Sequence, residues 1–312
     1  MSETFPHLTP GVLFVLGLIV AGLAGATIFV RLKERGRAGE PSELRLRIRT
    51  WWWMVGVLVA ALLISRTAMI VLLAFVSFLA LKEYFTIAET RRADRAVLFW
   101  AYLAIPVQYL FVGIAWYGMF IIFVPVYMFL VLPAVMVLNG ETRGFLRAAG
   151  SIHWGLMTTV FAVSHAAYLL AVPPPGDANG AGLLVTLLIL TEVNDVAQYV
   201  FGKRFGHRKI VPNVSPNKTW AGFLGGVGTT AVLSVVLCLA LTPVELPIAL
   251  LIGVLLGIAG FVGDLTVSAV KRDLDLKDTG SILPGHGGIL DRIDSLTFTA
   301  PLFFHIVRYF YY

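Results

Sequence analysis

Residues 247–270 read PIALLIGVLLGIAGFVGDLTVSAV, a stretch whose only ionisable side chain is that of Asp264. About 20 helical residues cross the roughly 30 Å hydrocarbon core of a bilayer, so this stretch is long and apolar enough to span it. The whole chain of 312 residues has the same character, because 58% of its residues are hydrophobic and only 13% are charged. These proportions exclude a soluble globular protein and make the bilayer the main solvent of the chain.

Further apolar segments of similar length occur along the chain. The run from Trp51 to Leu81 is too long for one crossing and is interrupted at Ser65, so we interpret it as two short spans joined by a tight turn. The other predicted spans are residues 11–30, 97–116, 117–137, 152–172, 181–201, 220–241 and 295–311. The sequence therefore predicts an all-α, polytopic integral membrane protein with about ten transmembrane helices.

Lysine and arginine collect in alternate connecting segments. Of the 24 basic residues, 22 fall in the segments 31–50, 82–96, 138–151, 202–219 and 271–294. Cytoplasmic loops are enriched in such residues, so we predict that these segments, with the catalytic loops among them, face the cytoplasm from a bacterial inner (plasma) membrane. Both termini then lie on the outer side. No basic residue precedes the first apolar segment, which we therefore expect to be a retained helix rather than a secretory signal.

The chain changes character after a predicted outer loop at residues 173–180. In residues 1–172 we identify no candidate site and predict an N-terminal transmembrane scaffold. In residues 173–312 polar residues enter the spans themselves, and we predict a C-terminal catalytic transmembrane region. The single cysteine, Cys238, lies inside a predicted span, so the chain has no intrachain disulfide and no cysteine-rich metal site.

Two of the later spans carry acids at a depth where an ionised group is costly unless it is paired, hydrated or bound to a metal. Asp195 shares a helix face with Glu192, and Asp264 shares a stripe with Ser268 and Lys271. For Asp195 the alternative is an ion pair with an arginine of another span, and for Asp264 it is helix packing alone. We expect both acids to line a polar site.

The predicted loop 202–219 combines five basic residues with glycine, proline, serine and threonine. Ser215, Lys218 and Thr219 directly precede a predicted helix, whose N-terminal amides favour an anion. Hydroxyls, amides and point charges of this kind suit phosphate binding, but the loop lacks the GxxxxGK[ST] pattern of a P-loop. The alternative is a basic loop that only sets topology.

Residues 268–294 concentrate ten ionisable side chains in 27 positions between two apolar spans. The cations are Lys271, Arg272, Lys277 and Arg292, and the carboxylates are Asp273, Asp275, Asp278, Asp291 and Asp294. Basic groups that neutralise phosphates, beside oxygen ligands that favour Mg²⁺ over Zn²⁺, are typical of phosphoryl or nucleotidyl transfer. The role of His286 stays open between a proton carrier, a phosphate contact and a turn residue.

The run SAVKRDLDLKDTGSILPGHGGILDRID, residues 268–294, resembles the diagnostic motif of the phosphatidate cytidylyltransferases, also called CDP-diglyceride synthases. The resemblance extends upstream through Gly263-Asp264, SPNKTW at 215–220 and Asn194-Asp195. Two positions depart from the family pattern. Ala221 stands where a glutamate is common, and the segment from Asn194 replaces an Asp-Thr-Gly-Ala-Tyr-type sequence. We interpret these departures as marks of a divergent subgroup.

The resemblance implies transfer of CMP from CTP to phosphatidic acid in phospholipid biosynthesis, giving CDP-diacylglycerol and pyrophosphate with the help of a divalent metal ion. It implies that Asp264 and Asp291 hold Mg²⁺, with Asp294 and Asp195 in support, and it leaves a second metal ion open. By the same resemblance CTP is bound by Ser215, Lys218, Thr219 and Asp195. Catalytic roles are expected for Lys271, Arg272, Lys277, Asp278, His286 and Arg292.

Two other functions fit parts of the same pattern. A CTP-dependent lipid kinase of the polyprenol type would transfer the γ-phosphate instead of CMP. A secondary transporter would also carry acids inside its membrane helices. The expected partners are CTP, phosphatidic acid and membrane lipids rather than nucleic acid, and a homodimer is left open.

Overall fold

The computed structural model describes residues 7–35, 42–88, 91, 94–171, 180–280 and 287–312. Within these residues the chain consists of helices, their connecting turns and one isolated β-bridge between Lys209 and Thr219. Nine helical segments in the described ranges are long and apolar enough to cross a membrane. This confirms the prediction of an all-α, polytopic membrane protein.

The helices follow one another along the chain with short connections. Their bounds are α1 (Pro10–Lys33), α2 (Glu43–Ile64), α3 (Arg66–Ile87), α4 (Arg95–Gly113), α5 (Tyr117–Ile122), α6 (Phe129–Leu138), α7 (Phe145–Leu156), α8 (Val163–Ala171), α9 (Gly180–Phe205), α10 (Trp220–Leu241), α11 (Leu246–Asp273), α12 (Leu290–Ile293) and α13 (Leu296–Tyr311). Two π-helical turns, Phe123–Met128 and Met157–Ala162, join α5 to α6 and α7 to α8, so each of these pairs forms one continuous span.

The apolar run from Trp51 to Leu81 forms two helices, as predicted, but neither is short. Both α2 and α3 are 22 residues long, and α2 begins far enough upstream to include three arginines that were predicted to lie in a loop. The turn between the two helices is made at Ser65. This residue ends α2, and its hydroxyl accepts a hydrogen bond from Ala68 N at 3.0 Å at the start of α3. A single residue therefore makes the whole turn.

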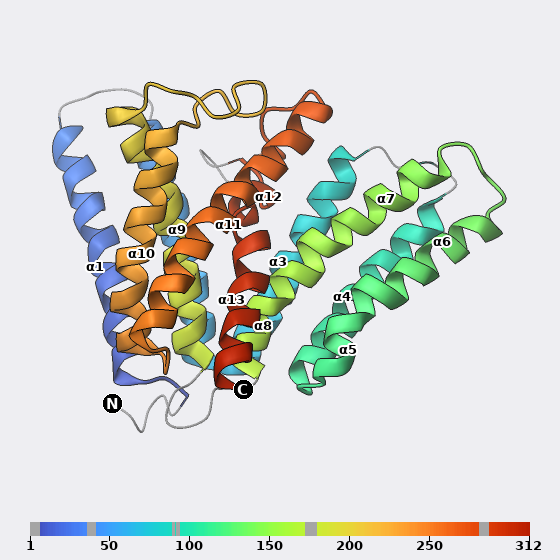
Figure 1. The fold of residues 1–312 in the computed structure, drawn as a ribbon, viewed down its shortest axis with the longest axis horizontal. Helices are drawn as coiled ribbons and strands as arrows, with labels where there is room; N and C mark the ends of the chain where they lie inside the picture. The colour runs from blue at the N-terminus through green and yellow to red at the C-terminus, as the bar shows by residue number, and fades with distance from the viewer. Residues whose placement is uncertain (1–6, 36–41, 89–90, 92–93, 172–179, 281–286) are drawn as a thin grey trace.

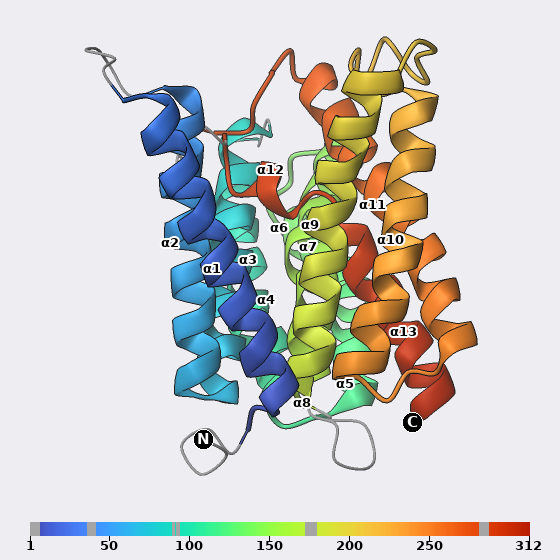
Figure 2. The same cartoon turned by 90° about the vertical axis from the view of Figure 1, so that its left-hand side faces the viewer.

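The last predicted span, 295–311, forms α13, which is only 16 residues long. At 1.5 Å per residue this helix extends about 24 Å, which is less than the roughly 30 Å of a bilayer core. The short helix α12 and the residues before it provide the missing length by descending into the bundle beside α3 (Figure 2). The start of α13 thus lies below the upper ends of α9 and α11.

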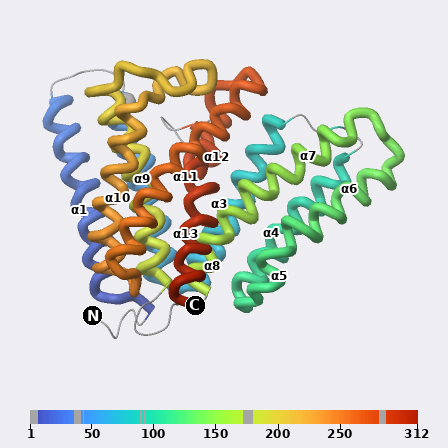
Figure 3. The backbone as a smooth tube through the Cα atoms, in the orientation of Figure 1, coloured from blue at the N-terminus to red at the C-terminus, as the bar shows by residue number. Residues whose placement is uncertain are grey.

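The helices stand side by side, and their described connections lie at two ends of the bundle (Figure 1). The α6–α7, α9–α10 and α11–α12 connections lie at one end, whereas the start of α1, the α10–α11 turn and the end of α13 lie at the other (Figure 3). Helix α9 packs against α10, and α10 packs against α11. Helix α13 contacts both α11 and α8, and so connects this trio to the N-terminal helices.

Candidate active site

A set of hydrogen bonds from Asn194, here called the polar clasp, joins α9, α10 and α11, and two of these helices carry the predicted acids Asp195 and Asp264. The side chain of Asn194 on α9 donates through Nδ2 to the carbonyl oxygen of Gly257 on α11 at 3.2 Å. Its Oδ1 accepts from the hydroxyl of Thr230 on α10 at 3.2 Å. Asn194 is buried, and a Cβ on Gly226 would lie 2.8 Å from its Oδ1. The asparagine that departs from the family pattern therefore connects helices, and Asp195 beside it is left to face the site.

Three of the predicted acids gather where this clasp meets α13. Asp294 interacts electrostatically with Asp264 and Asp195. The hydroxyl of Ser295 donates to Asp195 Oδ2 at 2.8 Å, and the backbone N–H of Ser295 donates to Asp294 Oδ1 at 2.7 Å. A Cβ on Gly263 would lie only 2.6 Å from the carbonyl oxygen of Asp294, so glycine at this position lets α11 and the start of α13 approach each other.

Lys218 brings the basic α9–α10 loop to these acids. Its ammonium forms an ion pair with Asp264 and donates to Gln198 Oε1 at 2.9 Å. The loop is held by the β-bridge that pairs Lys209 with Thr219, and the hydroxyl of Thr219 caps α10 by accepting from Gly222 N at 3.1 Å. The predicted nucleotide loop therefore ends at the acid cluster, with Lys218 as its contact.

The acid cluster, which consists of Asp195, Asp264 and Asp294, is short of positive charge. Burial, together with the neighbouring carboxylates of Asp264 and Asp195, raises the pKa of Asp294 well above its ordinary value. Arg292 attracts these acids, but its buried Nε has no hydrogen-bond partner among the described residues. Mutual repulsion of the three carboxylates favours the binding of a cation. The arginine nitrogen without an acceptor favours the binding of an anion beside it.

Asp291 has different surroundings. Its Oδ1 accepts from Lys271 Nζ at 2.7 Å, and its Oδ2 accepts from the backbone N–H of Thr279 at 2.9 Å and of Gly288 at 3.1 Å. Burial opposes ionisation of this carboxyl, but these hydrogen bonds and the charge of Lys271 keep the pKa of Asp291 below its ordinary value. Asp291 is therefore ionised at neutral pH and tightly oriented.

Glu83 on α3 is a site residue that the sequence analysis missed. It lies in the region predicted to be scaffold, is 5% exposed, and accepts hydrogen bonds from Thr279, Ile289 and Leu290. The only sequence signal is that Glu83 is the sole acid between residues 44 and 88. No motif surrounds it, because its partners are 196 or more positions away in the chain.

The remaining predicted residues lie around these two clusters. Lys277 and Asp278 are exposed at the end of the bundle. Arg272 donates to the carbonyl oxygens of Val214 at 3.3 Å and Leu276 at 2.9 Å, which ties α11 to the nucleotide loop. The backbone of Ser215 bonds within that loop. His286 lies outside the described residues.

The predicted metal ligands do not converge on one point in this structure. Among the described residues, no group of three His, Cys, Asp or Glu side chains is close enough to hold a metal ion. Asp264 pairs with Lys218, and Asp291 pairs with Lys271. The donors are nevertheless carboxylate oxygens, the ligands that a hard divalent cation prefers, and the repulsion around Asp294 is of the kind that such an ion relieves.

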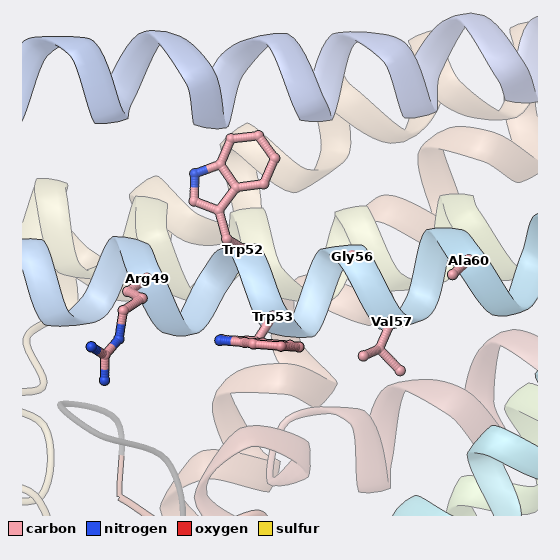
Figure 4. Close-up of a pocket in the computed structure, with 6 residues that line it drawn as sticks. All are labelled: Arg49, Trp52, Trp53, Gly56, Val57 and Ala60. Carbon is pink, nitrogen blue, oxygen red and sulfur yellow. The ribbon is translucent and has the colours of Figure 1, made fainter.

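A separate apolar pocket of 440 Å³ lies on α2 and contains none of the predicted site residues. Trp52 points toward α1, where its ring nitrogen donates to the hydroxyl of Thr27 at 2.9 Å, whereas Arg49, Trp53 and Val57 point the other way (Figure 4). Trp53 is 72% exposed. This pocket is a lipid-facing feature of the N-terminal helices, distinct from the charged clusters.

Comparison with known proteins gives a match to the family described as "Cytidylyltransferase family" over residues 45–310. The uncharacterized protein YnbB of Escherichia coli (strain K12) is 46% identical over 297 residues, which cover 95% of this chain and 96% of that protein. The similarity to YnbB therefore extends through the N-terminal helices as well as the charged clusters.

Two phosphatidate cytidylyltransferases match the C-terminal part. The protein of Bacillus subtilis (strain 168) is 42% identical over 135 residues, which cover 43% of this chain and 50% of that protein. The protein of Synechocystis sp. is 43% identical over 129 residues, which cover 40% of this chain and 44% of that protein. The match spans about half the length of these relatives. Together the comparisons confirm the resemblance predicted from residues 268–294.

Proposed function

This chain belongs to the cytidylyltransferase family, and from that premise we propose that it transfers CMP from CTP to phosphatidic acid, forming CDP-diacylglycerol and releasing pyrophosphate. Members of this family are nucleotidyltransferases. The observation that carries the proposal is the pairing of cations with carboxylates in two clusters, to which four separate elements contribute. The contributing residues are Asp195 on α9, Lys218 in the α9–α10 loop, Asp264 and Lys271 on α11, and Asp291 on α12.

The chemistry of this transfer explains why such a charge pattern is needed. A phosphate oxygen of phosphatidic acid attacks the α-phosphorus of CTP, a new P–O bond forms, and the bond to the β-phosphate breaks. The attacking oxygen is already anionic at pH 7, so little general-base catalysis is required. The main barrier is repulsion between two polyanions, which amounts to about 4 kcal/mol for each pair of charges 4 Å apart at an effective dielectric near 20.

The basic side chains supply the opposing charge. Lys218 would bind the CTP phosphates, with the Ser215 and Thr219 hydroxyls beside it in the same loop. Lys271 and Arg272 would face the lipid phosphate and the departing pyrophosphate, with Lys277 and Arg292 as further cations. In the free protein Lys218 and Lys271 pair with Asp264 and Asp291, and the proposal requires both lysines to turn to substrate phosphates.

The acids freed in this way would hold divalent cations. We assign one Mg²⁺ to Asp264 and Asp294 with Asp195 in support, and a second metal ion to Asp291. When bound, such ions neutralise phosphate oxygens and stabilise the leaving pyrophosphate. The donor type and the mutual repulsion of these carboxylates support this assignment.

The position of the site suits a reaction between a soluble and a membrane substrate. Lys218 lies in the α9–α10 connection, at the end of the bundle that carries the basic loops (Figure 1), and we use the positive-inside rule to assign this end to the cytoplasm. CTP would arrive from the cytoplasm, while phosphatidic acid would arrive laterally from the bilayer. We propose a bacterial inner membrane as the location.

Labelled CTP tests the reaction class directly. The purified protein in detergent micelles with phosphatidic acid and Mg²⁺ is expected to move label from the α-phosphate of CTP into lipid and to release unlabelled pyrophosphate. Label from the γ-phosphate should remain in pyrophosphate. Micelles without phosphatidic acid, and ATP in place of CTP, serve as controls.

The same assay decides between the alternatives. Lipid that carries γ-label would instead identify a CTP-dependent lipid kinase, and absence of any lipid-dependent CTP cleavage would favour a transporter. Pyrophosphate release that requires another anionic lipid would leave the family reaction intact and show that phosphatidic acid is the wrong acceptor. The substitution Ala221, where the family commonly has glutamate, makes a panel of acceptor lipids part of this experiment.

A further inference from the structure

Glu83 is a buried carboxylate whose hydrogen-bond partners are neutral groups. Its Oε2 accepts from Ile289 N at 2.8 Å, and its Oε1 accepts from Leu290 N at 3.1 Å and from the hydroxyl of Thr279. Thr279 and Ile289 belong to the segment that joins α11 to α12, and Leu290 is the first residue of α12, while Glu83 belongs to α3. Glu83 is only 5% exposed, and a buried carboxylate is tolerated only when its oxygens are hydrogen-bonded. These three contacts together therefore satisfy the buried carboxylate.

Thr279 connects Glu83 to Asp291, a predicted metal ligand. Its hydroxyl lies against Glu83 Oε1 and also lies 2.9 Å from Asp291 Oδ2, and Thr279 is 4% exposed. A hydroxyl carries one proton and two lone pairs. The Thr279 hydroxyl can therefore donate to only one of the two carboxylates at a time, and both compete for it. The position of Glu83 therefore constrains the hydroxyl that supports the oxygen of Asp291.

Two glycines of the same segment leave room for the Glu83 side chain. A Cβ on Gly288 would overlap with Glu83 Oε1, and a Cβ on Gly280 would lie 3.0 Å from Glu83 Oε2. Neither glycine has a positive φ, so the backbone conformation does not require glycine at these two positions. Their absent side chains instead allow the backbone of the loop to close over the carboxylate.

We propose that Glu83 is a positioning residue for the transfer reaction, because it holds Thr279 and the start of α12 so that the Asp291 carboxylate keeps one orientation. This inference rests on the proposed function of the site. It assigns a role in catalysis to the N-terminal helices, since α3 provides the only side chain that accepts hydrogen bonds from both Ile289 N and Leu290 N in the described part of the chain.

The test compares four purified variants. Glu83→Gln keeps the side-chain size but places an amide N–H against one of the three donors, and Thr279→Val removes the hydroxyl at nearly constant shape. Each is expected to lower kcat by about 10- to 100-fold, the usual effect of losing a partner of a metal ligand, while the KM for CTP changes by less than about threefold. Thr279→Ser keeps the hydroxyl and should restore most of kcat. Glu245→Gln, an exposed acid at the other end of the bundle, is the matched control with unchanged turnover.

A double variant and hydrogen exchange make the outcome decisive. If Glu83 acts through Thr279, the double variant Glu83→Gln with Thr279→Val loses no more kcat than the worse single variant; fully additive losses would overturn the proposal. Amide exchange at Ile289 and Leu290 should accelerate about tenfold in Glu83→Gln, and unchanged exchange would also overturn it. If the wild-type protein cleaves no CTP, the proposed function fails, and the exchange rates alone still decide whether Glu83 holds the loop.

Discussion

Asp264 and Asp291 each pair with a lysine, yet the two carboxylates are held in different ways. Asp264 is partly exposed beside two other acids, and its Oδ1 accepts a hydrogen bond from the hydroxyl of Ser268 at 3.3 Å. Asp291 is 6% exposed and accepts hydrogen bonds from Lys271 and from two backbone N–H groups, and the Thr279 hydroxyl that it shares with Glu83 lies 2.9 Å from its Oδ2. Apart from its lysine, Asp264 thus has few contacts that fix its orientation, whereas the backbone N–H groups of Thr279 and Gly288 would keep Asp291 oriented after Lys271 has left it.

Neutral replacements of these two acids should abolish turnover. Asp264→Asn and Asp291→Asn keep the side-chain shape but remove the charge that balances Lys218 or Lys271, so we expect pyrophosphate release to fall by at least about 100-fold. The measurement is CTP cleavage by purified protein, with thermal unfolding to show that each variant folds. Near-normal activity in either variant would contradict the metal assignment.

Asp275, in the segment between α11 and α12, provides the control for these variants. Asp275 has a φ of 55°, in the left-handed region where asparagine is as well tolerated as aspartate. Asp275→Asn should therefore remove one exposed negative charge without strain and leave turnover unchanged.

Among the elements, α10 and α11 approach each other closely at Gly253. A Cβ on Gly253 of α11 would overlap with the Ser234 hydroxyl of α10 and lie 2.6 Å from the Cα of Ala231. The same hydroxyl donates to the carbonyl oxygen of Ala249 at 2.6 Å. Small residues and an interhelical hydrogen bond of this kind are the usual means of association between membrane helices.

A larger side chain at this contact should separate the helices. Gly253→Val is expected to destabilise the protein by about 1–3 kcal/mol through overpacking, and to lower the thermal unfolding temperature in detergent. Gly228→Val on α10 is the matched control, because nothing lies within 4 Å of the Cβ position at Gly228. Equal stability of the two variants would contradict this packing.

The sequence predicted most elements and only part of the site, for a physical reason. Helices that cross a membrane are identified by apolar length, so the spans were found, and errors arose at boundaries that apolar length does not set, as at the start of α2, where Ser42 is the N-cap. Residues one or two turns apart, such as Asp264 and Ser268, were placed correctly on one stripe. The contact of Glu83 with Thr279 depends on how α3 packs against α12, which no local pattern records.

For the molecule as a whole, the two ends of the bundle differ in charge. The described parts of the basic loops lie at the end where α9 meets α10, and the chain begins and ends at the other (Figure 1). The positive-inside rule then predicts that the end with the basic loops faces the cytoplasm. The protein has one cysteine, Cys238, which is buried, so single cysteines can be added at either end without background labelling.

Cysteine labelling in intact cells tests this orientation. Asn213→Cys in the α9–α10 loop should react with a membrane-impermeant maleimide only after the cells are opened. Glu245→Cys at the α10–α11 turn should react in intact cells. Both positions are exposed, so failure to react would reflect the membrane barrier, and the reverse pattern would contradict the assignment of the cytoplasmic face.

The shortness of α13 has a kinetic consequence. Because this helix extends only about 24 Å, we expect the acids beside its start to lie below the membrane surface rather than above it. A phospholipid headgroup at that depth reaches them without leaving its leaflet, so the enzyme and its lipid meet by diffusion in two dimensions. The concentration that governs turnover is then the mole fraction of acceptor in the bilayer. Dilution with neutral lipid should slow the reaction, while dilution with buffer should not.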